Sequence, residues 1–299
     1  MLLTQILKRG EHFSNIDNII ASYILEKGEE LNTETVRSIA ENTYVSPATV
    51  MRFFQRLGYN GYRTFKKDFL EEITYFSSHF QNIDPNLPFL PQDDGKVRTN
   101  KLAALFKETI DDVLALTDYA MLQRAYHMIA KAKLIYVYSA GIQIGLCEIF
   151  KDKMIKIGKT VIVSNVIDEL YYSACFTQRD AAFILVSYSG ETKTILEVAA
   201  KLKERSISCI AITSYGNNTL SKYSDCCLYV STREKINAKI GDFSFNISVL
   251  FLMDVLYSYY FASDYFGNYQ SRRNYLTGFE QNRGNMKKSI KNPILIDDK

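Results

Sequence analysis

Residues 181–192 read Ala-Ala-Phe-Ile-Leu-Val-Ser-Tyr-Ser-Gly-Glu-Thr. The continuous apolar run over 181–186 predicts a strand that is buried on both faces. A helical pattern of apolar residues starts directly after Thr192 and continues to Leu202. Three hydroxyl groups and a glycine therefore lie where a buried strand runs into a helix.

Such a junction suits a phosphate group. It offers free backbone N–H groups and the positive end of a helix dipole. Ser187, Ser189 and Thr192 add hydroxyl donors, and Gly190 lets the backbone approach an anion. The alternative is an ordinary turn in which a serine caps the helix. Because three hydroxyls occur together, we favour the anion site.

The pattern Ser-x-Ser-Gly-x-Thr after a buried strand resembles the sugar-isomerase (SIS) domain, which binds phosphosugars. The similarity extends upstream to the strand and small-residue turn of residues 134–141, and downstream to the strand at 207–213 and the segment 218–225. It covers roughly residues 101–262. The resemblance implies an α/β fold with a doubly wound, flavodoxin-like parallel sheet, in which ligands bind beyond the carboxyl ends of the strands.

The turns after the first, third and fourth strands then supply the expected ligand-binding residues. The resemblance assigns the phosphate to Ser187, Ser189 and Thr192. Glu191 either accepts a hydrogen bond from a sugar hydroxyl or favours the first turn of the helix. The full expected set is Ser139, Gly141, Gln143, Ser187, Ser189, Gly190, Glu191, Thr192, Thr213 and Ser214.

Two positions depart from the SIS pattern. Gln143 stands where relatives often have serine, and Phe245-Asn246 stand where many relatives have Ser-Arg. The absent arginine removes a charge partner for an acidic ligand. Replacement cations are available at Lys193, Lys235 and Lys239.

Composition narrows the protein class. The 299 residues suffice for two domains, and 47% hydrophobic residues indicate a globular chain. The N-terminal apolar stretch is too short for a signal peptide. The apolar segment Ile247–Ala262 carries Asp254 and predicts a buried helix rather than a membrane span.

Cysteines and histidines suggest no metal or cofactor chemistry. The five cysteines lack metal-ligand spacing, and their odd number favours reduced thiols in the cytoplasm. The three histidines are scattered along the chain. We therefore expect no metal, no cofactor and no catalytic residues.

Proline clustering divides the chain. Three of the five prolines, Pro85, Pro88 and Pro91, fall in a polar segment without periodicity. It separates a helical N-terminal unit from a C-terminal unit in which strands and helices alternate. We expect a helix-turn-helix domain at 1–80, a linker at 81–100, an SIS domain at 101–265 and a basic tail at 266–299, partly disordered.

The N-terminal unit carries a helix-turn-helix pattern. Residues 35–42 predict a short helix, and Ser46 with Pro47 predicts the start of a second helix that ends at Gly58. No acidic residue occurs from Asn42 to Lys67, whereas five basic residues do. The apolar stripe of the second helix includes Phe53 and Phe54, of which one should be partly exposed.

This pattern predicts contact with DNA phosphates and base edges. The alternative is a small helical docking domain with solvated arginines. The residues expected at a DNA duplex are Ser46, Thr49, Arg52, Gln55, Arg56, Arg63, Lys66 and Lys67.

The segment Val45–Tyr59, followed by Gly61–Lys66, resembles the RpiR/MurR family of bacterial transcription regulators, which join this helix-turn-helix to a C-terminal SIS domain. The resemblance implies a cytoplasmic homodimer or dimer of dimers that binds a double-stranded DNA operator, without a membrane, and responds to a phosphosugar effector. Two alternatives remain: a regulator whose SIS domain only dimerises, and a sugar-phosphate isomerase, whose base would be Glu191, Asp168 or Glu234.

Overall fold

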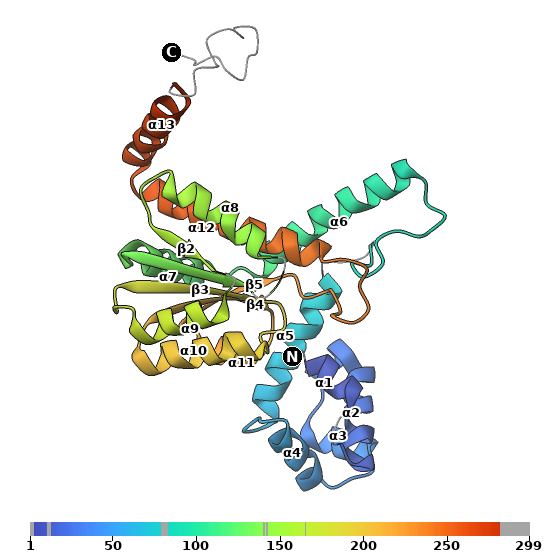
Figure 1. The fold of residues 1–299 in the computed structure, drawn as a ribbon. Helices are drawn as coiled ribbons and strands as arrows, with labels where there is room; N and C mark the ends of the chain where they lie inside the picture. The colour runs from blue at the N-terminus through green and yellow to red at the C-terminus, as the bar shows by residue number, and fades with distance from the viewer. Residues whose placement is uncertain are drawn as a thin grey trace.

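The computed structural model describes residues 3–10, 13–78, 83–139, 141, 143–164 and 166–281. Figure 1 shows a helical N-terminal unit and an α/β C-terminal unit. The N-terminal unit contains α1 (Leu3–Arg9), α2 (Asn15–Lys27), the 3-10 helix η1 (Gly28–Asn32), α3 (Val36–Asn42), α4 (Pro47–Arg56) and α5 (Tyr62–Ser78). The C-terminal unit contains α6 (Gly95–Leu116), α7 (Tyr119–Lys131), β1 (Leu134–Ser139), α8 (Ile144–Ile155), β2 (Val161–Val163), α9 (Ile167–Phe176), β3 (Ala181–Ser187), α10 (Lys193–Arg205), β4 (Ser208–Ser214), α11 (Thr219–Tyr223), β5 (Cys226–Val230), α12 (Phe243–Ser263) and α13 (Tyr265–Gln281).

The helix-turn-helix consists of α3 and α4. Thr35 and Ser38 form a capping box at the start of α3. Ser46 accepts a hydrogen bond from the N–H of Thr49, and Pro47 occupies the first turn of α4, as predicted. Helix α4 therefore begins at Pro47, as predicted, and its last residue, Arg56, lies two residues before the predicted end at Gly58.

The aromatic core of the N-terminal unit corrects one expectation. Phe53 and Phe54 are both buried, although one was expected to be partly exposed. The Phe53 ring contacts Phe13 at 5.5 Å between centroids, and Phe54 packs on Phe65 at 4.6 Å. Helix α4 can bury two adjacent rings because other segments of this small domain pack against both sides of it.

The sheet of the C-terminal unit is parallel and has the order β2-β1-β3-β4-β5. This is the flavodoxin-like order that the resemblance implied. One core lies between the sheet and α6, α7, α8 and α12, and a second lies between the sheet and α9, α10 and α11. All seven residues of β3 are buried because helices cover both faces. The sequence analysis did not identify α9 or β5.

Helix α12 is the only helix in the described part of the chain that is long and apolar enough to cross a membrane, judged by length and composition. In the structure it packs against α6, α7, α8 and β5. Val249, Leu252, Met253 and Leu256 of this helix lie within the first core. We therefore assign α12 to the core of the domain, as expected.

The proline-rich segment is more ordered than its composition indicated. Helix α6 begins at Gly95, inside the expected linker. Asn86 is buried and its side chain accepts a 2.6 Å hydrogen bond from the N–H of Lys235. Arg233 donates to the carbonyl oxygen of Ile83 at 2.7 Å and pairs with Glu108. Residues 83–90 are therefore attached to the C-terminal unit.

The segment expected to be a basic tail begins as a helix. Figure 1 shows α13 extending away from the sheet after α12. Tyr265, Phe266 and Tyr269 of this helix are exposed. Residues 282–299, the rest of the predicted tail, lie outside the described residues.

Candidate functional site

The carboxyl ends of three neighbouring strands bring the expected ligand hydroxyls to one edge of the sheet. In the strand register, Ser139 of β1 pairs with Val186 of β3, and Ser187 pairs with Thr213 of β4. Ser139, Ser187 and Thr213 are buried, and Ser214 follows at the end of β4. The structure thus aligns the ends of β1, β3 and β4, as the topology required.

The loop between β3 and α10 is organised by its own hydroxyl groups. Ser187 Oγ lies 3.0 Å from Thr192 Oγ1 and accepts a 3.2 Å hydrogen bond from the N–H of Gly190. Ser189 Oγ accepts from the N–H of Glu191 at 3.1 Å. We name residues 187–192 the hydroxyl loop.

Among the residues that the structure describes, none caps the first turn of α10 with its side chain. Its N-cap residue, Thr192, makes no side-chain hydrogen bond to the helix, whereas Ser46 caps α4 and Asn218 caps α11. The ordinary-turn alternative required such a cap. The first N–H groups of α10 therefore remain available for an anion, and the helix dipole favours one there.

Gly190 lies where the turn after β3 comes close to the start of α11. Its φ angle is +65°, and a Cβ at this position would overlap the side-chain amide of Asn218. Asn218 in turn donates to Thr213 Oγ1 at 3.2 Å and to the carbonyl oxygen of Ser214 at 3.0 Å. Asn218 was not among the predicted site residues, although its place before a short helix identifies it as an N-cap.

Glu191 makes a contact that neither expectation for it included. Its Oε1 accepts a 2.8 Å hydrogen bond from the N–H of Thr219, at the start of α11. The residue is exposed. Glu191 thereby joins the hydroxyl loop to α11.

The two departures from the SIS pattern meet in space. Gln143 Nε2 donates to Asn246 Oδ1 at 3.2 Å, and Gln143 is buried beside the turn that contains Gly141. Phe245 is also buried and packs on the Tyr188 ring at 5.0 Å between centroids. The pair Gln143–Asn246 therefore forms a neutral amide contact next to the hydroxyl loop.

Glu234 serves as a structural carboxylate. Its side chain is fully buried, and Oε1 accepts a 2.5 Å hydrogen bond from the N–H of Ser244 at the start of α12. Burial raises the pKa of Glu234, although Lys239, 3.2 Å away, acts in the opposite direction. Because both oxygens are engaged, Glu234 is poorly placed to act as the base of an isomerase.

The expected cations at this edge differ in availability. Lys239 pairs with both Glu234 and Asp242, and its ammonium lies 4.9 Å from the centre of the Tyr188 ring. Lys193 and Lys235 are exposed. Lys239 is therefore occupied within the protein, and Lys193, in the first turn of α10, is the better placed cation.

The expected DNA-contacting face of α4 is open to solvent. Ser46, Arg52, Gln55 and Arg56 are exposed, and Thr49 is partly exposed. In the described part of the chain, no ion pair involves Arg52 or Arg63. The outward orientation predicted for the polar residues of this helix is therefore found.

Arg56 also makes a contact within the fold. It forms an ion pair with Asp17, whose carboxylate also accepts from the Ser14 backbone at the start of α2. Burial alone would raise the pKa of Asp17, but the hydrogen bonds from Ser14 and the Arg56 guanidinium lower it overall. Because the Arg56 side chain is still 55% exposed, it can face a phosphate while holding α2 to α4.

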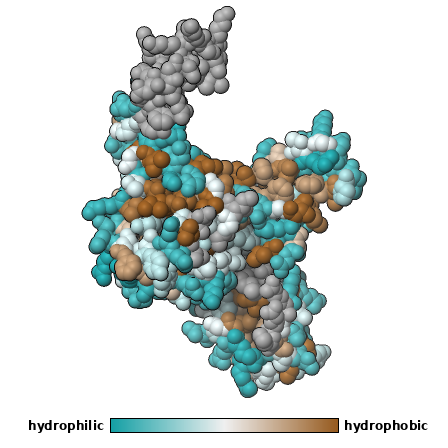
Figure 2. Space-filling model, in the orientation of Figure 1, coloured by the Kyte–Doolittle hydropathy of each residue, from teal (hydrophilic) through white to brown (hydrophobic). Residues whose placement is uncertain are grey.

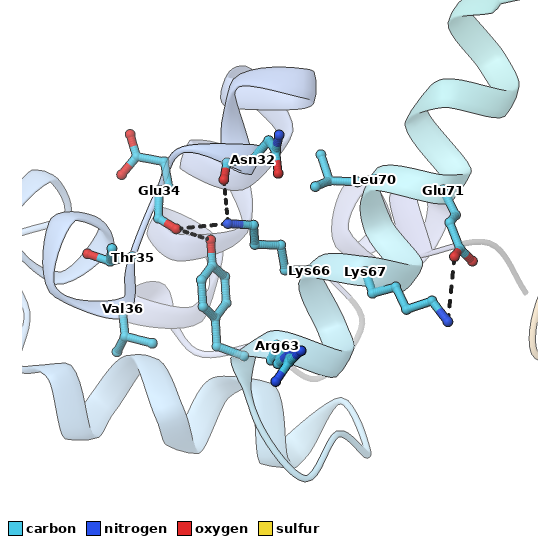
Figure 3. Close-up of a pocket in the computed structure, with 10 residues that line it drawn as sticks. Asn32, Glu34, Thr35, Val36, Arg63, Lys66, Lys67, Leu70 and Glu71 are labelled. Atoms are coloured by element: carbon cyan, nitrogen blue, oxygen red, sulfur yellow. Dashed lines mark hydrogen bonds and ion pairs between the residues drawn. The ribbon is translucent and has the colours of Figure 1, made fainter.

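Lys66 is committed to the fold. Its ammonium donates to the carbonyl oxygens of Asn32 and Glu34, at 2.5 and 3.3 Å, and the Tyr62 hydroxyl also donates to Glu34 O (Figure 3). Lys67 lies 3.7 Å from Glu71 on the same helix. Of the three basic residues expected on α5, Arg63 is thus the one most available to DNA.

The same region holds a cavity of about 850 Å³ between η1, α3 and α5. Figure 3 shows the Lys66 ammonium directed toward the η1–α3 connection. Since the polar groups on this wall already bond one another, we assign no ligand to the cavity. Its lining residues are Asn32, Glu34, Thr35, Val36, Tyr62, Arg63, Lys66, Lys67, Leu70 and Glu71.

Comparison with protein families agrees with both halves of the structure. Residues 1–75 match the helix-turn-helix domain of the rpiR family, and residues 128–258 match the SIS domain. The first match contains α3 and α4, and the second contains the whole parallel sheet.

Curated relatives match most of the chain. An HTH-type transcriptional regulator of Thermotoga maritima is 26% identical over 267 residues, 88% of this chain and 92% of the relative. The HTH-type transcriptional regulator HexR of Pseudomonas aeruginosa is 22% identical, covering 78% of this chain and 80% of HexR.

A solved structure shares the fold. The Vibrio vulnificus NanR protein, complexed with ManNAc-6P, superposes with a TM-score of 0.61 at 24% identity, covering 93% of this chain and 98% of NanR. The two domain matches and the curated relatives show that the chain belongs to the rpiR family of helix-turn-helix transcriptional regulators with a C-terminal SIS domain, and that it is a regulator rather than an enzyme.

Proposed function

We propose that this regulator is a cytoplasmic protein whose SIS domain binds a phosphorylated sugar or amino sugar and thereby changes its affinity for a DNA operator. The observation that carries the proposal is the uncapped first turn of α10 beside three hydroxyls, in a chain that also exposes the polar face of α4. NanR, which has the same fold, was solved with ManNAc-6P.

The hydroxyl loop suits a phosphate monoester. Ser187, Ser189 and Thr192 surround the start of α10, and Gly190 lets this loop pack closely against Asn218. Several short donors and a helix dipole can hold a phosphate without a dedicated arginine. The neutral Gln143–Asn246 pair would then face the uncharged part of the ligand.

A chain of direct contacts connects the hydroxyl loop to the segment that leads to the DNA-binding unit. The Tyr188 hydroxyl donates to the carbonyl oxygen of Glu234 at 2.6 Å. The neighbouring Lys235 N–H donates to Asn86 Oδ1, and the Ile240 N–H donates to Asn86 O at 3.0 Å. A ligand that moves Tyr188 would therefore act on residues 83–90, which precede α6 and follow α5.

An apolar surface on the C-terminal unit supports a homodimer. Figure 2 shows hydrophobic residues gathered across the upper part of this unit, where Figure 1 places α8 and α12. Ile149 and Ile155 of α8 are 42% and 50% exposed. A pair of such surfaces would bury each other, and a dimeric regulator would read two half-sites of an operator.

The ligand can be tested by thermal unfolding. A phosphorylated sugar such as ManNAc-6P, at about 100 times its dissociation constant, should add about 2.7 kcal/mol of stability, and the unphosphorylated sugar much less. Ser189→Ala should remove most of this shift with little change in the unliganded melting temperature, since Ser189 is on a partly exposed loop. Ser263→Ala, at the opposite end of α12, is the control. A panel of phosphosugars without any shift would favour an SIS domain that only dimerises.

DNA binding depends on α4. Arg52→Ala should weaken binding to an operator by about 1–3 kcal/mol if Arg52 contacts a base, with relaxed preference at one position. A phosphate contact would instead give a uniform loss and a shallower salt dependence. Fluorescence anisotropy at two salt concentrations separates these cases. Arg98→Ala, on α6, should bind like the wild type, and equal binding by Arg52→Ala would remove Arg52 from the interface.

The contacts through Asn86 predict a variant that loses only the coupling between ligand binding and DNA binding. Asn86→Ala removes the bonds to Lys235 and Arg233, so it should keep the separate affinities for ligand and DNA within about twofold. The change in DNA affinity caused by the ligand, a coupling of typically about 1–3 kcal/mol, should fall to near zero. Gln92→Ala, an exposed position in the same segment, should retain it. Full coupling in Asn86→Ala would exclude this route.

The dimer surface is tested by light scattering on the full chain. Ile155→Asp should shift the dimer toward monomer because a buried unpaired carboxylate is costly. Ile240→Asp, at a similarly exposed isoleucine in the loop before α12, should leave the mass unchanged. If both variants remain dimeric, the interface lies elsewhere than α8.

A further inference from the structure

The turn between α3 and α4 contains an exposed residue with a left-handed backbone. Tyr44 has φ +55° and the residue is 97% exposed. Bulky residues rarely adopt this region, because Cβ crowds the following carbonyl group. The conformation must therefore be imposed by the surrounding chain.

Two hydrogen bonds impose it. The Tyr44 N–H donates to the carbonyl oxygen of Glu41 at 3.3 Å, and the Val45 N–H donates to the carbonyl oxygen of Ala40 at 3.0 Å. This pair of bonds defines a Schellman motif, which requires a left-handed residue and usually has glycine there. Thr43 Oγ1 reinforces the turn by donating to the carbonyl oxygen of Ile39.

The same motif recurs at three other helix ends in the described part of the chain. After α4 and α8 the left-handed residue is Gly58 and Gly158, and after α10 it is Ser206. The fold itself thus uses glycine or a small residue where a helix ends in this way. A tyrosine at position 44 is the exception, and because it is 97% exposed, burial of its side chain does little to offset the backbone cost.

Strain that the fold does not need is a sign of function. Tyr44 lies two residues before Ser46, the cap of α4, whose N-terminal residues would contact base edges in the proposed function. The turn that leads into such a helix lies beside the DNA backbone, and tyrosine hydroxyls are common donors to phosphate oxygens. The left-handed backbone points this ring away from the domain.

We propose that the Tyr44 hydroxyl contacts a phosphate of the operator backbone next to the groove that receives α4, an inference that rests on the proposed function. The contact carries no base information. It fixes how deeply and at what angle α4 enters the groove, and its cost is a less stable turn in the free protein.

The test uses opposite effects on stability and binding. The DNA probe is a duplex selected by the wild-type protein from a random pool, with an unrelated duplex beside it. Tyr44→Gly should raise the melting temperature by a few degrees, since glycine relieves the strain, while it weakens binding to both duplexes by about tenfold or more. Tyr44→Phe should lose about tenfold as well, with no gain in melting temperature.

Ser206→Gly is the matched control. It relieves the same backbone conformation in the SIS domain, so it should raise the melting temperature without changing DNA affinity. Full DNA affinity in Tyr44→Gly or in Tyr44→Phe overturns the hydroxyl contact while leaving the proposed function intact. A wild-type protein that selects no duplex overturns the proposed function and this contact together.

Discussion

The close approach of Gly190 to Asn218 is the constraint on which the C-terminal site depends. The Gly190 carbonyl oxygen accepts from the Leu220 N–H at 3.0 Å, and the Tyr188 carbonyl oxygen accepts from the Ser214 N–H at 3.1 Å. These bonds fix the turn after β3 against the turn after β4. A side chain at position 190 would separate them, and the first turn of α10 would no longer face the edge where the strands end.

That constraint also ties the site to the rest of the chain. The Tyr188 ring contacts Phe245 edge-on and lies 4.9 Å from the Lys239 ammonium, and its hydroxyl donates to Glu234 O. Glu234 in turn caps α12, the helix that packs on α6 and α8. The loop that would receive a ligand is thereby connected to long helices that can carry a displacement as rigid elements.

Much of this organisation could be predicted from the sequence because it rests on local rules. The buried run of β3, the Ser46 cap and the order of the two domains each follow from patterns within about 20 residues. The burial of both Phe53 and Phe54 could not, since it depends on tertiary packing that includes Phe13, which is distant in sequence. The same holds for Asn86, whose partners lie about 150 residues away.

The candidate site also contains residues that the local sequence identifies and residues whose roles depend on tertiary contacts. The hydroxyl loop is a contiguous motif, so its residues were identified directly, and the strand register placed Ser139 and Thr213 beside it. The roles of Glu191, Arg56 and Lys66 were missed because each bonds a backbone or carboxylate from another segment. A charged residue in a motif can face a ligand or hold the fold, and only tertiary contacts distinguish the two.

Under the proposed function, the neutral pair Gln143–Asn246 limits the charge that a ligand can carry in this part of the site. Relatives of the SIS type often have serine and arginine at these positions, whereas this chain has two amides bonded to each other. A second anionic group placed there would be desolvated without a cation to offset the cost. The side-chain oxygen and the second side-chain N–H of Gln143 can still bond hydroxyl or acetamido groups. Under the proposed function, a ligand with one anionic end, at α10, and a neutral body would fit this site better than a phosphorylated sugar acid.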